Sequence, residues 1–589
     1  MTEANQHTDK TAAAAAKTTA PAGTSADAAP LLDVKDLEVT FSTLAGPVNA
    51  VRGVSFELYR GENLAIVGES GSGKSTAVTA ILGLLAENGK VTGGHALFKG
   101  KDLTKLSRRE IEDVRGKEIG YVPQDPMSNL NPVWNIGFQV QETIEANTSL
   151  RGKAARERVI EVLKEAGLPE PEGRLKQYPH QFSGGMRQRV LIGIGMSANP
   201  RLLVADEPTS ALDVTVQRRI LDHLGELTRE HGTSVIFITH DLGLAAERAE
   251  KLVVMYKGQV VEYGDSKEIL ANPMHPYTKR LVGAAPSLAS RRIQSVQEGD
   301  DVAVGADEKL LRRHEETPDV KRVDENPLIE FTDVTKVYKI REKGLKTTDF
   351  KAVDKVSLQI PRGTTMGVVG ESGSGKSTLA KMFLKLEDIT EGTMTFDGKD
   401  VANWPQKDLL AFRRRVQPVF QDPYGTLDPM RSIGASIAEP LETHKIGDRR
   451  SRRKTVEELL NQVSLPKATA NRYPGELSGG QRQRIAIARA LSLKPEVLVL
   501  DEAVSALDVL VQGQVLNLLA DLQTELGLTY LFITHDLAVV RMVADQVTVM
   551  KNGQVVEQAS TDEVFDNPKE QYTRDLLEAI PGGDFVFGS

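Results

Sequence analysis

The sequence predicts two consecutive α/β domains, each with a largely parallel sheet that has an antiparallel portion near its start. Three observations lead to this prediction. The 589-residue chain repeats five sequence blocks in the same order, about 300 residues apart. Short β-branched runs alternate with helical stretches within each copy. A glycine-rich turn follows one of these runs in both copies, directly before a helix.

Composition limits the classes of protein to which the chain can belong. It is 40% hydrophobic and 26% charged with a formal net charge of −8, which is typical of a globular protein and argues against nucleic-acid binding through bulk charge. The absence of cysteine excludes disulfides, thiol catalysis and any cysteine-ligated zinc or iron–sulfur site. No apolar run approaches the roughly 18–20 residues that span a bilayer. The amino-terminal residues lack the pattern of a secretory signal.

The internal repeat defines the predicted domains. The paired blocks are 31–41 with 328–338, 51–76 with 353–378, 124–132 with 421–429, 201–217 with 496–512, and 235–242 with 531–538. Between the copies, residues 289–325 are charge-dense and nearly free of aromatic side chains, which is typical of a linker. We therefore predict a disordered tail (1–30), a first domain (31–270), an HPYT-type element with a charged linker (271–327), a second domain (328–565), and a carboxyl-terminal element with a tail (566–589).

A phosphate-binding loop is predicted after the strand NLAIV of the first copy and at the matching place in the second. GESGSGKST occurs at 68–76 and at 370–378, and it satisfies the pattern G-x-x-x-x-G-K-[ST] both times. The glycines let backbone N–H groups close on phosphate oxygens, the lysine reaches the β- and γ-phosphates, and the serine hydroxyl suits Mg²⁺. A lone match could be a glycine-rich turn, but two matches in the same context make that alternative negligible. The predicted nucleotide-binding residues here are Gly68, Ser70, Gly71, Ser72, Gly73, Lys74, Ser75 and Thr76, and Gly370, Ser372, Gly373, Ser374, Gly375, Lys376, Ser377 and Thr378.

Two acidic residues end an apolar strand in each copy. The runs LLVADE and VLVLDE end in Asp206 and Glu207, and in Asp501 and Glu502. We expect each aspartate to hold the Mg²⁺ shell through water, and each glutamate to orient and activate the attacking water, an effect typically worth about 10²–10⁴-fold in rate. Such acids could instead be solvated residues that cap a helix. Behind a phosphate-binding loop, the catalytic interpretation is favoured.

Polar residues at two further strand ends recur in both copies. His240 and His535 each follow a strand in the motif FITHD. A single histidine there would more often be structural, but its recurrence favours a catalytic imidazole that hydrogen-bonds the γ-phosphate and senses its loss. Gln124 and Gln421 offer an uncharged amide to the metal ion or to water. The predicted metal-binding residues are therefore Ser75, Gln124, Asp206, Ser377, Gln421 and Asp501.

A Ser-Gly-Gly turn begins a helix in each copy, in FSGGMRQR and in LSGGQRQR. Each serine is a good helix N-cap, and a helix start of this kind also attracts phosphate without a lysine. A capped amphipathic helix is the plain interpretation. We add the prediction that each turn faces the phosphate-binding loop of the other copy. The residues concerned are Ser183, Gly184, Gly185 and Met186, and Ser478, Gly479, Gly480 and Gln481.

Both copies resemble the nucleotide-binding domain of ABC-transporter ATPases over nearly their whole length. The resemblance lies in six motifs in the same order: the phosphate-binding loop, the glutamine, the Ser-Gly-Gly turn, the Asp-Glu strand end, the SALD segment and the histidine. The resemblance implies two tandem domains, each with a mixed-sheet core and a helical subdomain that carries the Ser-Gly-Gly signature. It also implies a head-to-tail arrangement around two ATP sites. Site one would join Lys74, Gln124, Glu207 and His240 to Ser478, Gly480 and Gln481, and site two would join Lys376, Gln421, Glu502 and His535 to Ser183, Gly185 and Met186.

Two further sequence features bear on these sites: a methionine in one signature turn and an aromatic residue near the start of each copy. Met186 cannot donate the hydrogen bonds of an amide, so site two is expected to be altered but still active. Phe41 and Tyr338 resemble the aromatic side chains that stack on adenine in this family and are included among the nucleotide-binding residues. Their positions relative to the phosphate-binding loops differ, and core aromatics of a strand explain them equally well.

A finer resemblance concerns the end of each copy. ANPMHPYTKRLVGAAP (271–286) and DNPKEQYTRDLLEAIP (566–581) resemble the carboxyl-terminal elements of oligopeptide, dipeptide and nickel importer ATPases. Some relatives bind an iron–sulfur cluster through cysteines after HPYT, which this chain cannot do. The resemblance implies a fusion of two ATPase subunits that uses ATP and Mg²⁺ to power peptide import. It further implies two transmembrane permease subunits, an extracytoplasmic substrate-binding protein, and a peripheral position on the cytoplasmic face of the cell membrane.

Two other functions stay open at this point. An importer ATPase for nickel or another small solute of the same subfamily would carry the same motifs. A tandem ATPase that acts on ribosomes or nucleic acid would also lack membrane spans. Such proteins usually carry a long basic helical insert, whereas the linker here mixes acidic with basic residues and contains glycine and proline. We therefore expect no nucleic-acid partner.

Overall fold

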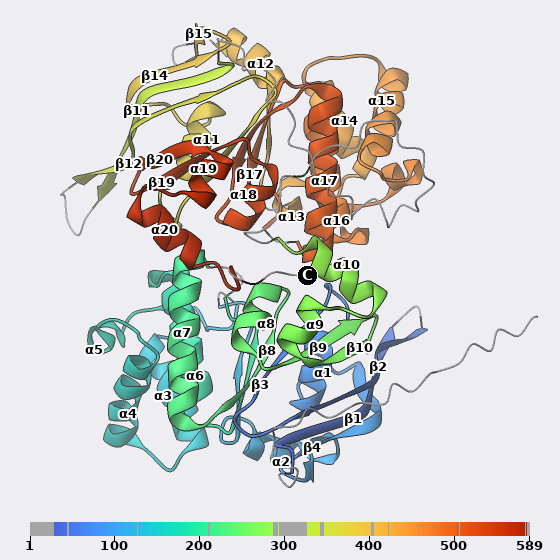
Figure 1. Cartoon of the computed structure of the whole chain (residues 1–589), viewed down its shortest axis with the longest axis vertical. Coiled ribbons are helices and arrows are strands. Elements are labelled where there is room, and N and C mark those ends of the chain that lie inside the picture. Colours follow the sequence, from blue (N-terminus) through green and yellow to red (C-terminus); the bar gives the residue numbers. More distant parts are fainter. Residues whose placement is uncertain are drawn as a thin grey trace, which may run out of the picture.

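The computed structural model describes residues 29–43, 46–126, 128–209, 212–286, 293, 327–341, 347–401, 404, 406–421, 423–505, 507–583 and 585. The two sequence copies form two halves that face each other (Figure 1). We call residues 29–286 half one and residues 327–585 half two. The predicted disordered tail and charged linker lie almost wholly outside the described residues.

Half one contains a four-stranded antiparallel sheet and a six-stranded sheet. The strand orders are β2-β1-β4-β5 and β10-β9-β3-β8-β7-β6. All neighbours in the second sheet are parallel except β9 and β10. The strands are β1 (Leu32–Thr43), β2 (Gly46–Leu58), β3 (Asn63–Val67), β4 (Gly89–Phe98), β5 (Lys101–Asp102), β6 (Ile119–Val122), β7 (Leu202–Asp206), β8 (Ser234–Ile238), β9 (Lys251–Tyr256) and β10 (Gln259–Asp265).

Half two repeats this topology. Its strand orders are β12-β11-β14-β15 and β16-β17-β18-β13-β19-β20, and β19 and β20 form the antiparallel pair of the larger sheet. The predicted mixed-sheet fold class is therefore confirmed in both halves. The strands are β11 (Ile329–Arg341), β12 (Thr347–Ile360), β13 (Thr365–Val369), β14 (Glu391–Phe396), β15 (Lys399–Asp400), β16 (Val416–Val419), β17 (Val497–Asp501), β18 (Thr529–Ile533), β19 (Gln546–Lys551) and β20 (Gln554–Ser560).

Helices cover the larger sheets and build a separate subdomain in each half. The subdomain that begins its last helix with Ser-Gly-Gly comprises α3 to α6 in half one and α13 to α16 in half two (Figure 1). The helices of half one are α1 (Lys74–Ile81), α2 (Arg108–Val114), α3 (Ile136–Asn147), α4 (Gly152–Glu165), α5 (Pro171–Arg174), α6 (Gly184–Met196), α7 (Val214–His231), α8 (Leu242–Arg248), α9 (Ser266–Ala271) and α10 (Pro276–Ala284). Those of half two are α11 (Lys376–Phe383), α12 (Gln406–Arg415), α13 (Pro423–Thr426), α14 (Ile433–Thr443), α15 (Arg449–Gln462), α16 (Gly479–Leu491), α17 (Val509–Leu526), α18 (Leu537–Val543), α19 (Thr561–Asp566) and α20 (Gln571–Glu578).

Burial explains why the central strands are continuous apolar runs. Every residue of β8 is buried, as is every residue of β13, because helices pack on both faces of the parallel sheet. Polar residues are thereby displaced to the strand ends, where the backbone leaves the core. The carboxyl ends of β3, β7 and β8 lie at the same edge of the sheet, since these strands are parallel neighbours.

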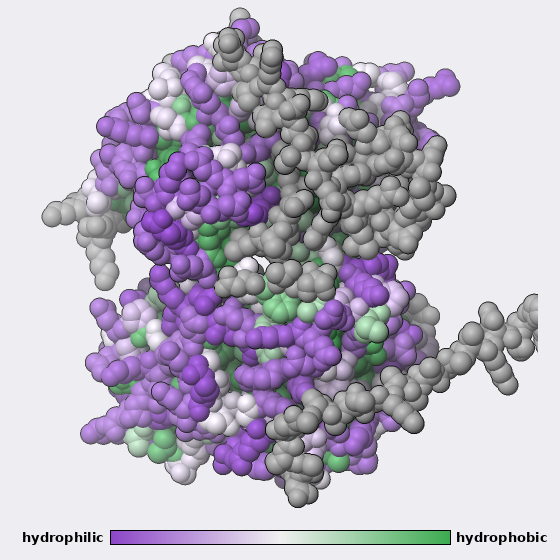
Figure 2. All heavy atoms as spheres, in the orientation of Figure 1, coloured by the Kyte–Doolittle hydropathy of each residue, from purple (hydrophilic) through white to green (hydrophobic). Residues whose placement is uncertain are grey.

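The two halves contact each other through the short helices near their carboxyl ends. Helix α10 packs against α17 of half two, and α20 packs against α7 of half one (Figure 1). Arg218 donates a hydrogen bond to the carbonyl of Glu578 at 3.0 Å, and the Gly582 N–H donates to the Glu247 carboxylate at 3.1 Å. Figure 2 shows a largely hydrophilic face with hydrophobic residues visible where the halves meet. Within the described ranges, no helix combines the length and apolar character needed to cross a membrane.

Candidate functional site

The phosphate-binding loop of half one connects β3 to α1. Gly68 has φ 148° and Gly73 has φ 99°, which are conformations that favour glycine. A Cβ on Gly68 would lie 2.2 Å from the Met255 carbonyl oxygen, and one on Gly73 would lie 2.7 Å from that of Ala50. The backbone therefore folds tightly around the start of α1, whose N–H groups face the place a phosphate would occupy.

Lys74 reaches back across this loop. Its Nζ donates to the carbonyl oxygens of Gly68 at 2.6 Å and Glu69 at 2.9 Å. The side chain is buried, and burial lowers its pKa below 10.5, while the carboxylates of Glu207 and Asp206 oppose the lowering. The ammonium group is thus held in place inside the loop, close to both predicted acids.

Glu207 lies at the centre of a hydrogen-bonded group. Gln124 Nε2 donates to Glu207 Oε2 at 2.6 Å, and His240 Nδ1 lies 3.2 Å from Glu207 Oε1. Burial alone would raise the pKa of Glu207, but the hydrogen bond and charge of His240 bring it below 4.5. Burial alone would lower the pKa of His240, but Glu207 raises it above 6.5. Each partner therefore favours the charged form of the other.

The backbone at Glu207 turns this side chain out of the sheet. Glu207 directly follows β7 and has φ 44°, an uncommon conformation for a residue with a side chain. Its N–H donates to the Ile238 carbonyl of β8 at 2.8 Å, which fixes the turn. Glu502 has φ 48° and the same bond to Ile533 in half two. Local strain at both positions is consistent with a functional role of the side chain.

Half two reproduces these contacts closely. Lys376 Nζ donates to the carbonyl oxygens of Gly370 at 2.7 Å and Glu371 at 2.8 Å. Gln421 donates to Glu502 at 2.6 Å, and His535 lies 3.3 Å from Glu502. The hydrogen bond from His535 is the main cause that lowers the pKa of Glu502.

Ser75 and Asp206 provide oxygen atoms suitable for Mg²⁺. The Ser75 hydroxyl donates to Asp206 at 3.4 Å, and Ser377 donates to Asp501 at the same distance in half two. Burial raises the pKa of Asp206 to about 6. Among the described residues, no group of three or more His, Cys, Asp or Glu side chains is arranged to hold a metal ion. Two protein oxygens per site fit Mg²⁺, which usually keeps waters and substrate phosphates as its other ligands.

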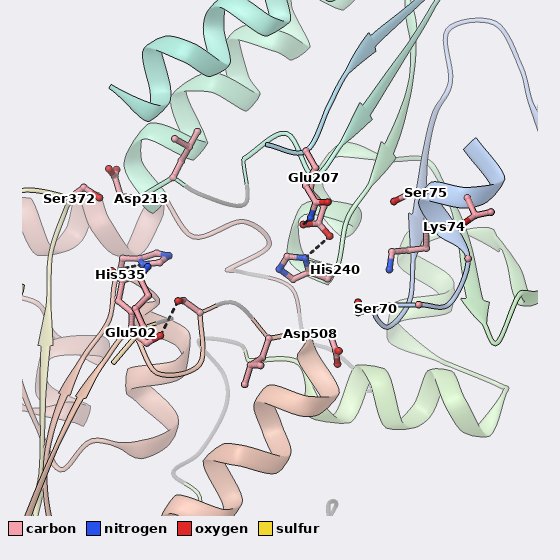
Figure 3. Close-up of a pocket in the computed structure, with 18 residues that line it drawn as sticks. Ser70, Lys74, Ser75, Glu207, Asp213, His240, Ser372, Glu502, Asp508 and His535 are labelled. Atoms are coloured by element: carbon pink, nitrogen blue, oxygen red, sulfur yellow. Dashed lines mark hydrogen bonds and ion pairs between the residues drawn. The ribbon is translucent and has the colours of Figure 1, made fainter. Parts of the chain in front are cut away.

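A cavity of about 730 Å³ brings residues of both sites together. It is lined by the predicted residues Ser70, Gly71, Gly73, Lys74, Ser75, Thr76, Gln124, Glu207, His240, Ser372, Gln421, Glu502 and His535. Across the interface, Asp508 of half two lies on the side of Ser70, and Asp213 of half one lies beside Ser372 (Figure 3). These two aspartates end the SALD segments. The sequence identified the segments as motifs, but it did not indicate that each would face the other half's phosphate-binding loop.

The Ser-Gly-Gly turns form the expected caps. Ser183 accepts a hydrogen bond from the Met186 N–H, and Ser478 accepts one from the Gln481 N–H, both at 3.3 Å. Gln481 also accepts a bond from the Ser478 N–H at 3.1 Å, so it closes a capping box that methionine cannot form. Both serines are exposed and neither lines the cavity, so the pairing of each turn with the opposite loop stays a prediction.

Phe41 and Tyr338 lie on the smaller sheets. Phe41 is half-buried in β1 and its ring lies over Gly89, where an added Cβ would meet it at 2.6 Å. Tyr338 lies in β11, with the Lys336 ammonium 5.0 Å from its ring centre. Neither residue lines the cavity, and their role in adenine binding stays a prediction.

The carboxyl-terminal elements contact the phosphate-binding loops. The Glu69 N–H donates to the Tyr277 hydroxyl of α10 at 2.9 Å, and the Glu371 N–H donates to the Tyr572 hydroxyl of α20 at 3.3 Å. The Tyr277 ring is buried and stacks on Tyr256, with centroids 4.2 Å apart. These tyrosines were not among the predicted site residues. Their recurrence in PYT and QYT is the sequence signal that could have indicated them.

Family models match both copies and both carboxyl-terminal elements. The model described as "ABC transporter" matches residues 51–210 and 353–505. The model described as "Oligopeptide/dipeptide transporter, C-terminal region" matches residues 261–303 and 556–585. The resemblance expected from the motifs is confirmed by these matches.

Curated proteins match over nearly the whole chain. The glutathione import ATP-binding protein GsiA of Salmonella paratyphi A is 42% identical over 95% of this chain and 90% of its own length. The peptidoglycan transport ATP-binding protein YejF of Agrobacterium fabrum is 44% identical over 93% and 96%. The oligopeptide transport ATP-binding protein OppD of Mycobacterium bovis is 42% identical over 94% and 99%. A solved dimeric ATP-binding cassette with ADP and Pi, in a post-hydrolysis state, is 32% identical over 40% of this chain and 98% of its own, with a TM-score of 0.36.

Proposed function

Because the chain belongs to the ABC transporter family, as an ATPase with two tandem nucleotide-binding domains, we propose that it powers the import of peptides. The carboxyl-terminal elements carry this proposal, since they match the oligopeptide/dipeptide transporter region and bind the phosphate-binding loops through Tyr277 and Tyr572. Relatives named for glutathione and oligopeptide transport support a peptide substrate.

The residues of each site suggest their roles in hydrolysis. Lys74 would release its loop carbonyls and bind the β- and γ-phosphates of ATP. Glu207, kept ionised by His240, would accept a proton from the attacking water at one of its carboxylate oxygens. The hydrogen bond from Gln124 fixes the orientation of that carboxylate. Lys376, Glu502, His535 and Gln421 would act in the same way at site two.

Mg²⁺ would be held by Ser75 and Asp206 at site one and by Ser377 and Asp501 at site two. When bound, it neutralises charge on the phosphates. Gln124 and Gln421 are the remaining proposed ligands of the metal. Each donates its amide N–H to the proposed catalytic glutamate here, so only its amide oxygen is left for the metal.

Transport requires membrane partners, and we propose two permease subunits, an extracytoplasmic binding protein and a peripheral position on the cytoplasmic face. An exposed apolar group after Gln124 supports a docking place for a permease. Val133 is 74% exposed, and Trp134 and Phe138 are half-exposed with their rings stacked at 4.4 Å. Met430, at the matching place in half two, is 84% exposed. Exposed apolar groups of this kind are typical of interaction surfaces.

Movement of the halves would couple ATP to transport. To change the ratio of joined to separated halves from 1:99 to 99:1, ATP must bind the joined state more tightly by about 5.5 kcal/mol. Two nucleotides that each bridge the halves, between a phosphate-binding loop and the opposite signature, would supply this difference. Hydrolysis would then remove it and release the halves.

The test is to purify the protein from mild-detergent extracts of its own cells and to measure peptide uptake. We expect two polytopic permeases and a binding protein to copurify, and cells that lack the protein to lose uptake of a labelled dipeptide or glutathione. A Glu207→Gln/Glu502→Gln chain is the matched control, because it should keep its partners but lose ATPase activity and uptake. Recovery of ribosomal proteins without permeases would refute the proposal, and loss of nickel uptake alone would assign the metal-importer alternative.

A further inference from the structure

Glu371 is the second residue of the phosphate-binding loop of half two, and it makes three different contacts. Its N–H donates to the Tyr572 hydroxyl at 3.3 Å, and its carbonyl accepts from Lys376 Nζ at 2.8 Å. Its carboxylate accepts a hydrogen bond from the hydroxyl of Thr215 at 2.5 Å. Thr215 belongs to half one, so this last bond ties the loop of one half to the other half.

Thr215 lies in the first turn of α7, two residues after the SALD aspartate Asp213. It is buried, with 8% of its surface exposed. Its hydroxyl also lies 3.0 Å from Asp213 Oδ1. Because a hydroxyl carries one hydrogen, it can donate to only one of the two carboxylates at a time. Glu371 is the nearer acceptor, at 2.5 Å, so the hydroxyl donates to it across the interface while Asp213 of its own half lies beside that bond.

The matching position in half two is different. The segment DVTVQ of half one corresponds to DVLVQ of half two, which places Leu510 where Thr215 stands. Leu510 is 6% exposed and packs in an apolar cluster with Tyr277 and Leu281 of α10. Glu69, the counterpart of Glu371, thus has a leucine opposite it in place of a hydroxyl.

The carboxyl of Glu69 lies near charged groups of both halves, Arg280 of half one and Asp508 of half two. Burial raises the pKa of Glu69, and the charge of Asp508 adds to the increase while Arg280 opposes it. Among the described residues, the only hydrogen bond found between a phosphate-binding loop glutamate and the other half is that of Glu371. The two ATP sites are therefore built differently at this point.

We propose that Thr215 is a positioning residue for site two: through Glu371, its hydroxyl holds the phosphate-binding loop of half two against half one, and this makes ATP binding at site two tighter. A loop that is already held loses less conformational freedom when ATP binds. The same half supplies Met186 to the predicted site two, so the hydroxyl adds an interaction where the signature lacks its amide. This inference rests on the proposed function only in assigning one ATP site to Lys74 and the other to Lys376.

The experiment measures ATP affinity at one site at a time. Glu207→Gln and Glu502→Gln stop hydrolysis, and Lys74→Ala leaves only site two able to bind. In the chain that carries these three substitutions, Thr215→Val keeps the shape of the side chain and removes the hydroxyl. We expect the Kd for radiolabelled ATP in equilibrium dialysis to rise about tenfold, because the lost hydrogen bond has an ionised acceptor. Thr215→Ser should restore the affinity to within about twofold. The matched control is Thr215→Val in the Lys376→Ala chain, where the affinity of site one should not change.

The outcomes separate the inference from its premise. An unchanged or lower Kd in the Thr215→Val chain would overturn the inference while leaving the ATP sites as assigned. Equal weakening at both sites would show a general structural effect and would also overturn it. ATP binding that survives Lys74→Ala together with Lys376→Ala would overturn the site assignment and the inference with it.

Discussion

Tyr277→Phe tests whether the carboxyl-terminal element of half one supports the phosphate-binding loop. The Tyr277 hydroxyl accepts the Glu69 N–H at 2.9 Å, while the ring is buried and stacked on Tyr256. Phenylalanine keeps the ring and its packing and removes only the oxygen. The substitution therefore isolates one hydrogen bond between α10 and the loop.

The expected magnitude follows from the burial of the two groups. A buried donor left without a partner costs about 1–3 kcal/mol, and the Glu69 N–H is only partly buried, so we expect about 1–1.5 kcal/mol. If this appears as lost ATP affinity at site one, the Kd rises about tenfold. If it appears as lost stability, the Tm of the domain falls by about 2–4 °C.

Tyr572→Phe is the matched variant in half two. Its hydroxyl lies 3.3 Å from the Glu371 N–H, so this longer bond is expected to contribute less. ATP binding is measured for Tyr277→Phe in the Lys376→Ala chain, which reports on site one, and for Tyr572→Phe in the Lys74→Ala chain, which reports on site two. Calorimetry of the full chain measures the Tm of both variants. An unchanged ATP Kd together with an unchanged Tm for Tyr277→Phe would refute the supporting role of the hydroxyl. A larger effect of Tyr572→Phe than of Tyr277→Phe would refute the reasoning from distance.

Three further predictions concern other contacts. Gly243→Ala would place a Cβ 2.1 Å from the Pro581 carbonyl oxygen, so we expect weaker docking of the carboxyl-terminal element, measured as faster proteolysis there; an unchanged cleavage rate would contradict this. Met186→Gln supplies the capping-box acceptor that half one lacks, so we expect the free energy of unfolding, measured with denaturant, to rise by about 0.3–1.5 kcal/mol. A fall in the free energy of unfolding would contradict this prediction. Glu496→Gln removes the partner of Arg415 at 2.5 Å, whose hydrogen bond lowers the pKa of Glu496 below 4.5. The pair is partly exposed, so it stabilises the fold by at most about 1 kcal/mol. Because the folded-state pKa of Glu496 is depressed, this stabilisation is present above pH 4.5 and is lost as the pH falls through the folded-state pKa. Urea unfolding of both chains at pH 7 and pH 4 checks this, and a difference that grows on acidification would contradict it.

Local sequence was sufficient for most individual site residues. Lys74, Glu207 and His240 each follow or adjoin a buried strand, and parallel strands bring their carboxyl ends to one edge of the sheet. This is why residues more than 100 positions apart could be assigned to one site. The separation of the antiparallel strands into a second sheet and the antiparallel pair at the end of each larger sheet were not predicted, because strand pairing depends on partners distant in sequence.

The contrast between Met186 and Gln481 shows where sequence reasoning reached only part of the answer. The difference in hydrogen-bonding capacity is evident from the residue types alone. The structure shows that the amide of Gln481 adds the second bond of the capping box to its own helix, whereas the matching helix of half one has only the bond from the Met186 N–H to Ser183.

The sequence by itself determined the two-domain α/β plan and the chemistry of each site, because strand periodicity, glycine-rich turns and strand-end polar residues are local properties of the chain. Only the tertiary structure decided which groups of one half meet the other. It placed Asp213 and Asp508 beside the opposite loops, tied Glu371 to Thr215, and joined Tyr277 to Glu69. These contacts are long-range, and they depend on the packing of α10 and α20 across the interface, which no local pattern specifies.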